Sequence, residues 1–255
     1  MPATRTRNKL ADLGAVAAGL AHEIRNPMNS LYINGQLLEE MLAELPERSV
    51  PQKEDLLSLA RANLKVTQRL NDTLSGFLRF ARPPAMELAP VDLNRILSET
   101  LRFIEMEFAH RGVTLKAKLH PTPLPILADE KLLKQAILNL LLNAQEAVEK
   151  EEKVIRVTTG VRAGRPYVAI HDNGRGIPPS DRRRIFTLFF TTRKNGSGLG
   201  LPIVRQIARQ HGGAVYVRSR EGKGTTMTVA LPFEEQFRAM FPGRLPLALP
   251  PGEHR

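Results

Sequence analysis

The sequence predicts an α+β protein, in which an antiparallel helical hairpin precedes a mixed α/β domain. Two observations lead to this prediction. Apolar side chains repeat with a seven-residue period from residue 10 to residue 45, and strand and helix patterns follow one another after residue 91. Proline-rich stretches at 46–52 and 82–90 separate these parts. We therefore expect a hairpin over 1–82, a linker over 83–90, an α/β domain over 91–232 and a loosely ordered, proline-rich tail over 233–255.

The helical hairpin is predicted from two amphipathic runs. One heptad position of the first run holds Ile24, Leu31 and Leu38, and the second run extends from Leu56 to Ala81. A single hairpin leaves one apolar stripe uncovered, and pairing two hairpins into a four-helix bundle covers it. We expect a homodimer with a dimeric four-helix bundle.

The α/β domain is predicted from the order of its patterns. Strands are expected within 113–119, 154–162, 166–172, 214–220 and 225–231, and helices over 92–110, 129–150 and from the glycine-rich loop to Gly212. The two middle strands are joined by an Ala-Gly turn and the last two by "EGKG". This succession is typical of helices packed on a sheet.

The charge is concentrated in one segment. The chain has a net charge of +11, and residues 151–232 carry 15 basic and 5 acidic side chains. Such a field suits a polyanion, either a nucleotide triphosphate or a nucleic acid. Only 5% of the residues are aromatic and several basic residues fall in one expected loop, so no nucleic acid partner is expected.

Composition excludes other classes. The chain has no cysteine, which excludes disulfides, thiolate metal sites and a cysteine nucleophile. It has no apolar run of about 18 residues, so no membrane segment is expected. The basic N-terminus is not followed by the apolar core of a secretory signal. These features favour a cytoplasmic protein, or a cytoplasmic piece of a larger one.

The stretch "GLAHEIRNPMNSL" places His22 at the outermost heptad position of the first helix. Glu23 can orient the imidazole or take its proton, and Asn26 lies one turn further on the same face. Pro27 removes a backbone donor, so the helix should bend there. The alternative is an ordinary solvated histidine.

Two amides, Asn139 and Asn143, lie four residues apart among leucines and so share one helix face. Buried amides are costly unless they are bonded, which indicates a ligand or a metal, or else a polar loop packed on the helix. The Asn143 oxygen suits Mg²⁺. Asp172 ends a strand before Gly174 and Gly176, where a carboxylate can accept from the adenine amine; an ordinary turn is the alternative.

Glycines at 196, 198 and 200 precede a helix, whose N-terminal N–H groups can bind phosphate. Their spacing fits neither the P-loop nor the dinucleotide fingerprint. Between the glycine stretches, residues 177–195 have no clear periodicity, as expected of a mobile lid. Arg193 and Lys194 are candidates for the terminal phosphates. Phe186, Phe189 and Phe190 are candidate anchors of the lid, with at least one of them expected to be a plain core aromatic.

The string "HEIRNP" resembles the phosphoacceptor box of sensor histidine kinases of two-component systems. The resemblance implies that His22 is phosphorylated, that Glu23 is its base or orienter, and that Asn26 aligns water in a phosphatase reaction. Four later stretches, in order, resemble the N, G1, F and G2 boxes of the same kinases, whose α/β-sandwich ATP-binding domain has the Bergerat fold. The "FFTTR" and "GSGLGL" forms are most similar to nitrogen-regulation kinases.

The resemblance covers about residues 8–232 and implies ATP and Mg²⁺ as cofactors, with Asn143 on the metal. It implies these nucleotide-binding residues: Asn139, Asn143, Asp172, Gly174, Gly176, Arg193, Lys194, Gly196, Gly198, Leu199 and Gly200. Glu146 departs from the family, many of whose members have a basic residue there, and the family's sensor domain is missing.

The function that the resemblance implies is autophosphorylation of His22 by ATP, followed by transfer to an aspartate of a response regulator. The alternative is an ATP-binding scaffold or degenerate kinase that does not phosphorylate itself.

Overall fold

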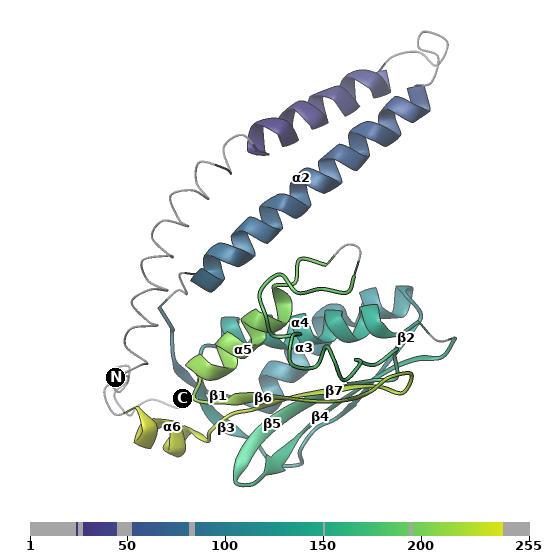
Figure 1. Cartoon of the computed structure of the whole chain (residues 1–255). Helices are drawn as coiled ribbons and strands as arrows, with labels where there is room; N and C mark the ends of the chain where they lie inside the picture. The colour runs from purple at the N-terminus through teal and green to yellow at the C-terminus, as the bar shows by residue number, and fades with distance from the viewer. Residues whose placement is uncertain are drawn as a thin grey trace, which may run out of the picture. The chain divides into compact units, whose positions relative to one another are not determined.

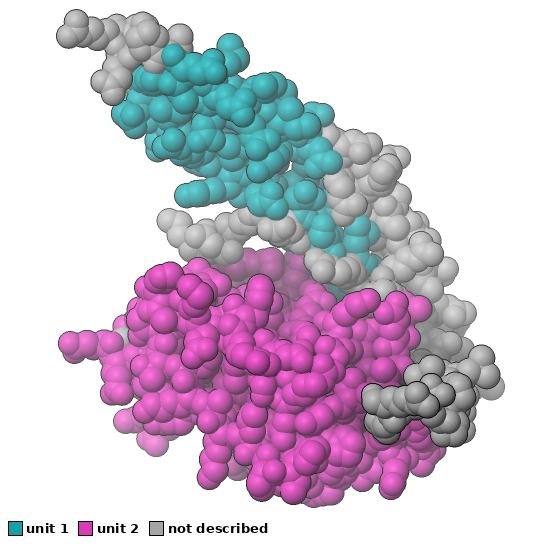
Figure 2. All heavy atoms as spheres, turned by 180° about the vertical axis from the view of Figure 1, so that it is seen from behind, with its two compact units in different colours: residues 1–84 teal, residues 85–255 magenta. Residues whose placement is uncertain are grey.

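The computed structural model describes residues 24, 28–44, 53–81, 85–149, 151–193 and 196–241. The chain forms two compact units, Met1–Pro84 and Ala85–Arg255 (Figure 2). The boundary falls inside the expected linker, and the second unit begins a few residues before its first strand.

The first unit contains a helix over residues 28–44 and the long helix α2, Lys53–Ala81 (Figure 1). The two helices are antiparallel, because Arg61 pairs with Glu39 while Lys53 donates to the Ala43 carbonyl. Near the middle of the hairpin, a Cβ on Gly35 would lie 2.9 Å from Leu64 Cδ2, so the backbone of the first helix comes close to α2 there. The predicted hairpin is present over the described residues.

One set of apolar side chains closes this hairpin and a larger set stays exposed. The closing set is buried and consists of Met28, Leu42, Leu57 and Ala60. The exposed set, which we name the stalk stripe, consists of Ile24, Leu31, Ile33, Leu37, Leu38, Met41, Leu56, Leu59, Val66 and Leu70. The predicted heptad positions at 24, 31 and 38 are in the stalk stripe. A single hairpin therefore does not cover them.

The second unit is built on a five-stranded sheet with the strand order β2-β4-β5-β7-β6. Only the pair of β2 with β4 is parallel, and the other pairs are antiparallel. The strands are β2 Val113–Lys118, β4 Lys153–Arg162, β5 Arg165–Asp172, β6 Ala214–Arg220 and β7 Gly224–Ala230. Every strand that the sequence predicts is present.

Three helices cover one face of this sheet: α3 Leu93–His110, α4 Glu130–Ala147 and α5 Gly200–Gln210 (Figure 1). Asp92 caps α3 by accepting from Asn94 N, and Asp129 caps α4 by accepting from Leu132 N. Gly212, with φ of +67°, follows the end of α5. Apolar side chains from these helices and from the inner face of the sheet form one core. This two-layer α/β sandwich confirms the predicted fold class.

Three elements were not predicted. The strands β1 Ala89–Asp92 and β3 Pro125–Ala128 pair in a small second sheet. Residues Glu234–Met240, which the sequence analysis places in the proline-rich tail, form helix α6. α6 packs near β3, and Phe237 is fully buried. Burial of this aromatic ring explains why the chain stays folded beyond residue 232.

Over the residues that the structure describes, no helix combines the length and the apolar character needed to cross a membrane.

Candidate functional site

The second unit holds a polar site at the end of β5, where Asp172 is 4% exposed. Its Oδ1 accepts from Gly174 N at 3.0 Å and from Thr225 N at 3.2 Å. Burial raises the pKa of this carboxyl, and the two backbone bonds act against that rise. Since both bonds end on Oδ1, Oδ2 is the oxygen that can accept from a donor on a ligand, such as an exocyclic amine.

The loop after Asp172 is pressed against two other elements. A Cβ on Gly174 would lie 2.2 Å from the Ala147 carbonyl oxygen at the end of α4. A Cβ on Gly176, whose φ is +74°, would lie 2.2 Å from the Arg220 carbonyl oxygen in the β6–β7 hairpin. Both glycines are therefore required by close backbone approach, so the loop is held between α4 and the hairpin.

The β6–β7 hairpin supports the same loop through hydrogen bonds. Ile177 N donates to Ser219 Oγ at 2.7 Å, and Gly222 N donates to the Arg175 carbonyl at 2.7 Å. Neither Ser219 nor Thr225 was predicted from the sequence. A hydroxyl residue at a strand end carries little signal until the register places it beside the loop.

The two predicted amides lie on α4. Asn139 and Asn143 are both half-buried, one turn apart. A Cβ on Gly200, the first residue of α5, would lie 3.5 Å from Asn143 Nδ2. Asn143 therefore faces the start of α5, where the predicted phosphate-binding N–H groups lie.

Arg193 joins the lid to α4. Its guanidinium donates to Asn143 Oδ1 at 2.8 Å and to the Asn143 carbonyl at 2.9 Å, and it pairs with Glu146. Burial lowers the pKa of Arg193, while the Glu146 carboxylate favours its charged form. The structure thus gives Glu146, the predicted departure from the family pattern, a cationic partner from the lid.

The lid and the glycine loop before α5 contact each other. Phe189 N donates to the Gly198 carbonyl at 3.1 Å, and a Cβ on Gly198 would lie 2.4 Å from the Phe189 carbonyl carbon. Gly196 lies against the Thr191 hydroxyl, and Leu199 is buried just before α5. The expected glycine-rich loop therefore packs on the lid and also leads directly into the start of α5.

The three lid phenylalanines do not behave alike. Phe186 and Phe190 pack against the core, and guanidinium groups lie over both rings, Arg205 at 5.6 Å and Arg184 at 4.4 Å from the centroids. Phe189 is 54% exposed and has a φ of +62°. Two of the three rings thus anchor the lid, which forms turns and no helix or strand over its described residues.

Four predicted site residues lie outside the described residues: His22, Glu23, Asn26 and Lys194. The site that the structure does bring together contains Asp172, the two glycine loops, Asn143 and Arg193. A buried acceptor, backbone donors at a helix start and a lid cation form a set suited to a purine nucleotide with its phosphates.

Comparison with known proteins assigns both parts of the chain. Residues 12–85 match the His Kinase A (phospho-acceptor) domain, and residues 128–235 match the histidine kinase-, DNA gyrase B- and HSP90-like ATPase. A solved structure of a mycobacterial sensor histidine kinase, MprB, is 30% identical to this chain, and the match covers 58% of this chain and 98% of that one, with a TM-score of 0.51. The chain belongs to the sensor histidine kinase family. This confirms the predicted family and its ATP-binding domain of the Bergerat type.

Longer histidine kinases match over most of this chain. Sensor histidine kinase ZraS of Klebsiella oxytoca is 35% identical over 92% of this chain and 49% of its own length. Full-length ShkA, solved in complex with AMPPNP, matches 86% of this chain and 46% of its own, with 29% identity and a TM-score of 0.70. The chain spans about half the length of the curated relatives it matches. The nitrogen-regulation subgroup stays a prediction.

Proposed function

We propose that this histidine kinase chain transfers the γ-phosphoryl group of ATP to His22 and then to an aspartate of a response regulator. The observation that supports this most is the site around Asp172 and Asn143, in a chain whose match to the phospho-acceptor domain contains His22. The likeness to ThkA, solved in complex with response regulator protein TrrA, supports the regulator as partner; it has 27% identity over 90% of this chain and a TM-score of 0.63.

The site would bind both the adenine base and the phosphates of ATP. Asp172 Oδ2 would accept from the adenine amine, and the close approach of Gly174 to the Ala147 carbonyl would hold the loop that carries this carboxylate against α4. The N–H groups at Gly198, Leu199 and Gly200 would donate to phosphate oxygens at the start of α5. Arg193 would leave Asn143 and neutralise the terminal phosphates.

The residues fit a Mg²⁺ ion bound mainly by phosphates and water. Asn143 Oδ1 is an oxygen acceptor on the wall of the site, and the described residues contain no group of three or more His, Asp and Glu that could hold a metal. Asn143 would supply the protein ligand. When bound, the ion neutralises charge on the phosphates during transfer.

In the transfer step, a neutral imidazole nitrogen of His22 would attack the γ-phosphorus in line. The nitrogen–phosphorus bond forms while the bond from the γ-phosphorus to the bridging oxygen breaks, and ADP leaves with that electron pair. Glu23 would take or orient the imidazole proton. Attack by a regulator carboxylate then breaks the nitrogen–phosphorus bond and returns His22. Alignment of water by Asn26 for a phosphatase reaction stays a prediction.

The test is labelling of the full chain with γ-labelled ATP and Mg²⁺. The expected product is an acid-labile, base-stable label that His22→Gln abolishes and Asn143→Ala reduces by about 100-fold or more. His110→Gln, at an exposed position at the end of α3, is the control. Label that persists in His22→Gln would refute the assignment. ATP binding with no label in the wild-type chain would establish the scaffold alternative instead.

A further inference from the structure

The five-stranded sheet has a second face, opposite α3, α4 and α5, on which no helix lies in the described part of the chain (Figure 1). Side chains alternate along each strand, so Val168, Ile170 and Val229 point into the core while their neighbours point outward. We name the outward residues the open face.

Positive side chains gather on the open face. The register places Lys116, Arg156, His171, Thr226 and Arg218 in one row across all five strands. The His171 ring, 3.0 Å from the Thr226 hydroxyl, confirms that this row shares one side. The open-face cations are Lys116, Lys118, Arg156, Arg162, Arg218 and Arg220, while the half-buried Arg165 donates to the Gly212 carbonyl.

This charge is not balanced locally. The outward positions of the five strands hold no aspartate or glutamate. None of the open-face cations forms an ion pair with another described residue. An array of cations without neighbouring carboxylates creates a positive field, which attracts a polyanion.

Two tyrosines lie among these cations. Tyr216, on β6, is 59% exposed. Tyr167, on β5, lies over Gly160 of β4. A Cβ on Gly160 would lie 2.9 Å from the Tyr167 hydroxyl oxygen. The outward residues beside them are small: Thr158, Gly160, Ala169, Ala214, Thr228 and Ala230. The two rings are therefore surrounded by small side chains on the sheet, and no large side chain blocks access to them.

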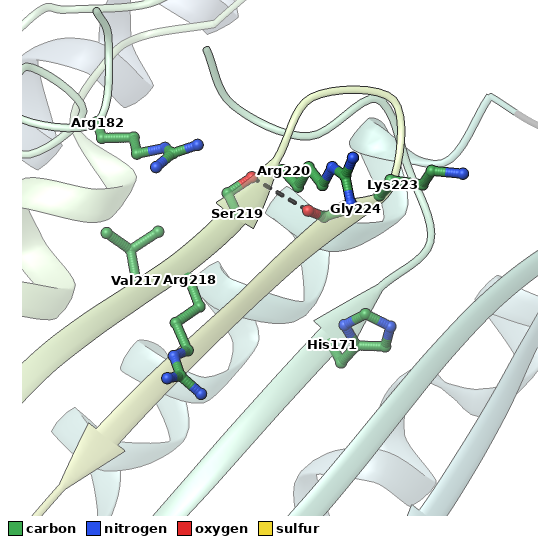
Figure 3. Close-up of a pocket in the computed structure, with 8 residues that line it drawn as sticks. All are labelled: His171, Arg182, Val217, Arg218, Ser219, Arg220, Lys223 and Gly224. Carbon is green, nitrogen blue, oxygen red and sulfur yellow. Dashed lines mark hydrogen bonds between the residues drawn. The ribbon is translucent and has the colours of Figure 1, made fainter. Parts of the chain in front are cut away.

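The open face continues into a hollow beside the β6–β7 hairpin (Figure 3). This hollow has a volume of about 480 Å³ and is lined by His171, Arg182, Arg218, Arg220 and Lys223, with Val217, Ser219 and Gly224. Arg182 and Lys223 come from outside the strands, so they extend the positive surface at this end. The lining contains no carboxylate.

We propose that the open face binds single-stranded nucleic acid, with phosphates on the open-face cations and bases stacked on Tyr167 and Tyr216. The exposed Tyr216 ring and the half-buried Tyr167 ring lie on a positive sheet, and aromatic rings on such a surface are the chemistry that holds unpaired bases. An anionic membrane would need the cations but not the rings, and no outward strand position offers an exposed large aliphatic side chain to insert. The low aromatic content hid this pattern in the sequence, since the two rings meet the cations only through the register.

The test measures binding of a fluorescein-labelled 20-nucleotide dT strand to the full chain by anisotropy, over a range of KCl and with saturating ADP. The affinity should fall with salt, with a log–log slope of roughly −0.7 for each phosphate neutralised. The double variant Arg156→Ser/Arg218→Ser should bind at least tenfold more weakly and have a shallower slope. Tyr216→Ala should bind about 5- to 100-fold more weakly at an unchanged slope, and Tyr216→Phe should bind like wild type.

The matched control is Arg102→Ser/Arg209→Ser, which removes the same charge from exposed positions on α3 and α5. Equal losses in both double variants would show attraction by net charge alone and overturn the proposal. Equal affinities for a duplex and for the single strand would also overturn it. The same holds if phosphatidylglycerol vesicles compete with the strand for the wild-type chain while Tyr216→Ala leaves the affinity for the strand unchanged. Autophosphorylation, measured on the same samples, should be unchanged in the open-face variants, which separates this inference from the proposed kinase reaction.

Discussion

At the scale of single residues, Arg193 is the side chain whose contacts bear most directly on the proposed kinase reaction. It holds the Asn143 oxygen that would be the metal ligand and pairs with Glu146 at the same time. In the proposed reaction, the Mg²⁺ that accompanies ATP would therefore compete with Arg193 for the Asn143 oxygen. The guanidinium would then exchange its bonds to α4 for bonds to phosphate.

Glu146→Gln should strengthen ATP binding. The change removes a carboxylate from beside the triphosphate and frees Arg193 from its ion pair, so we expect the Kd for ATP to fall roughly threefold to tenfold. Isothermal titration at low and high salt measures it, and the gain should shrink as salt screens the charges.

Glu149→Gln is the matched control for this variant. Glu149 lies just past the end of α4 and pairs with Arg175 at 3.5 Å, with 65% of its side chain exposed. Its substitution should leave ATP affinity near the wild-type value. Weaker binding by Glu146→Gln would contradict the competition between Arg193 and the nucleotide.

At the scale of elements, the lid and α5 meet at Gly198. The φ of +67° and the 2.4 Å that would separate a Cβ from the Phe189 backbone both exclude a side chain there. This one glycine therefore lies where the lid meets α5, the helix proposed to bind phosphate.

Gly198→Ala should weaken ATP binding by about tenfold or more, because the backbone must shift where phosphate is bound. Gly112→Ala separates backbone strain from crowding, since Gly112 has a φ of +69° with nothing within 4 Å of its Cβ position. Gly112→Ala should lower the free energy of unfolding by about 1–2 kcal/mol and leave ATP affinity unchanged. Titration of ATP and thermal unfolding distinguish the two variants. Equal ATP affinities in both variants would argue against a role of the contact with Phe189.

Another junction between elements is sensitive to pH. His211, at the end of α5, is 1% exposed; its Nδ1 donates to the Ile207 carbonyl and its Nε2 accepts from Asp129 N. Burial lowers the pKa of His211, so the folded state holds the ring neutral while the unfolded chain binds a proton near pH 6.5. Its stabilisation is complete above about pH 6.5 and is lost as the pH falls below that value.

His211→Gln should therefore flatten the fall in unfolding free energy between pH 7.5 and pH 5.5. The slope it removes is at most about 1.4 kcal/mol per pH unit, the value for one proton. Denaturant unfolding at each pH measures it, with His110→Gln as control. A variant that keeps the full wild-type slope would show that another group is responsible.

The long periodic elements could be predicted from the sequence, and the short ones could not. The helices at 92–110 and 129–150 and the alternating strands are long enough for their hydrophobic periodicity to distinguish helix from strand. β1 and β3 have four residues each, too few for a period, and α6 is stabilised by burial of Phe237, which only the folded domain reveals. Local pattern carries no information on such contacts.

Some residues of the candidate site could likewise be predicted from the sequence, and others could not. Asp172, Asn143 and the glycines were identified because their residue types are unusual at those positions. The pairing of Arg193 with Glu146 and the supports from Ser219 and Thr225 depend on register and on the lid, which residue type alone does not fix.

At the scale of the whole molecule, the stalk stripe bears on assembly. Its large apolar side chains are spread along both helices of the hairpin, and such an exposed array marks an interaction surface. The predicted homodimer would bury the stripe in a four-helix bundle.

Leu38→Glu should weaken this dimer by about 100-fold or more, because a charge would be buried at the seam without a partner. Sedimentation velocity over a range of protein concentrations measures the dissociation. Lys65→Glu, at an exposed position of α2 outside the stalk stripe, should leave the dimer intact. A Leu38→Glu chain that sediments like wild type would place the dimer contact elsewhere.

Asp129 has a mechanical consequence for the ATP-binding domain. Its carboxylate caps α4 and accepts from Glu87 N, and its own N–H donates to His211. Glu87 lies near the start of the second unit, so tension on the incoming chain would act directly on the Asp129 cap, at the first turn of the helix that carries Asn143.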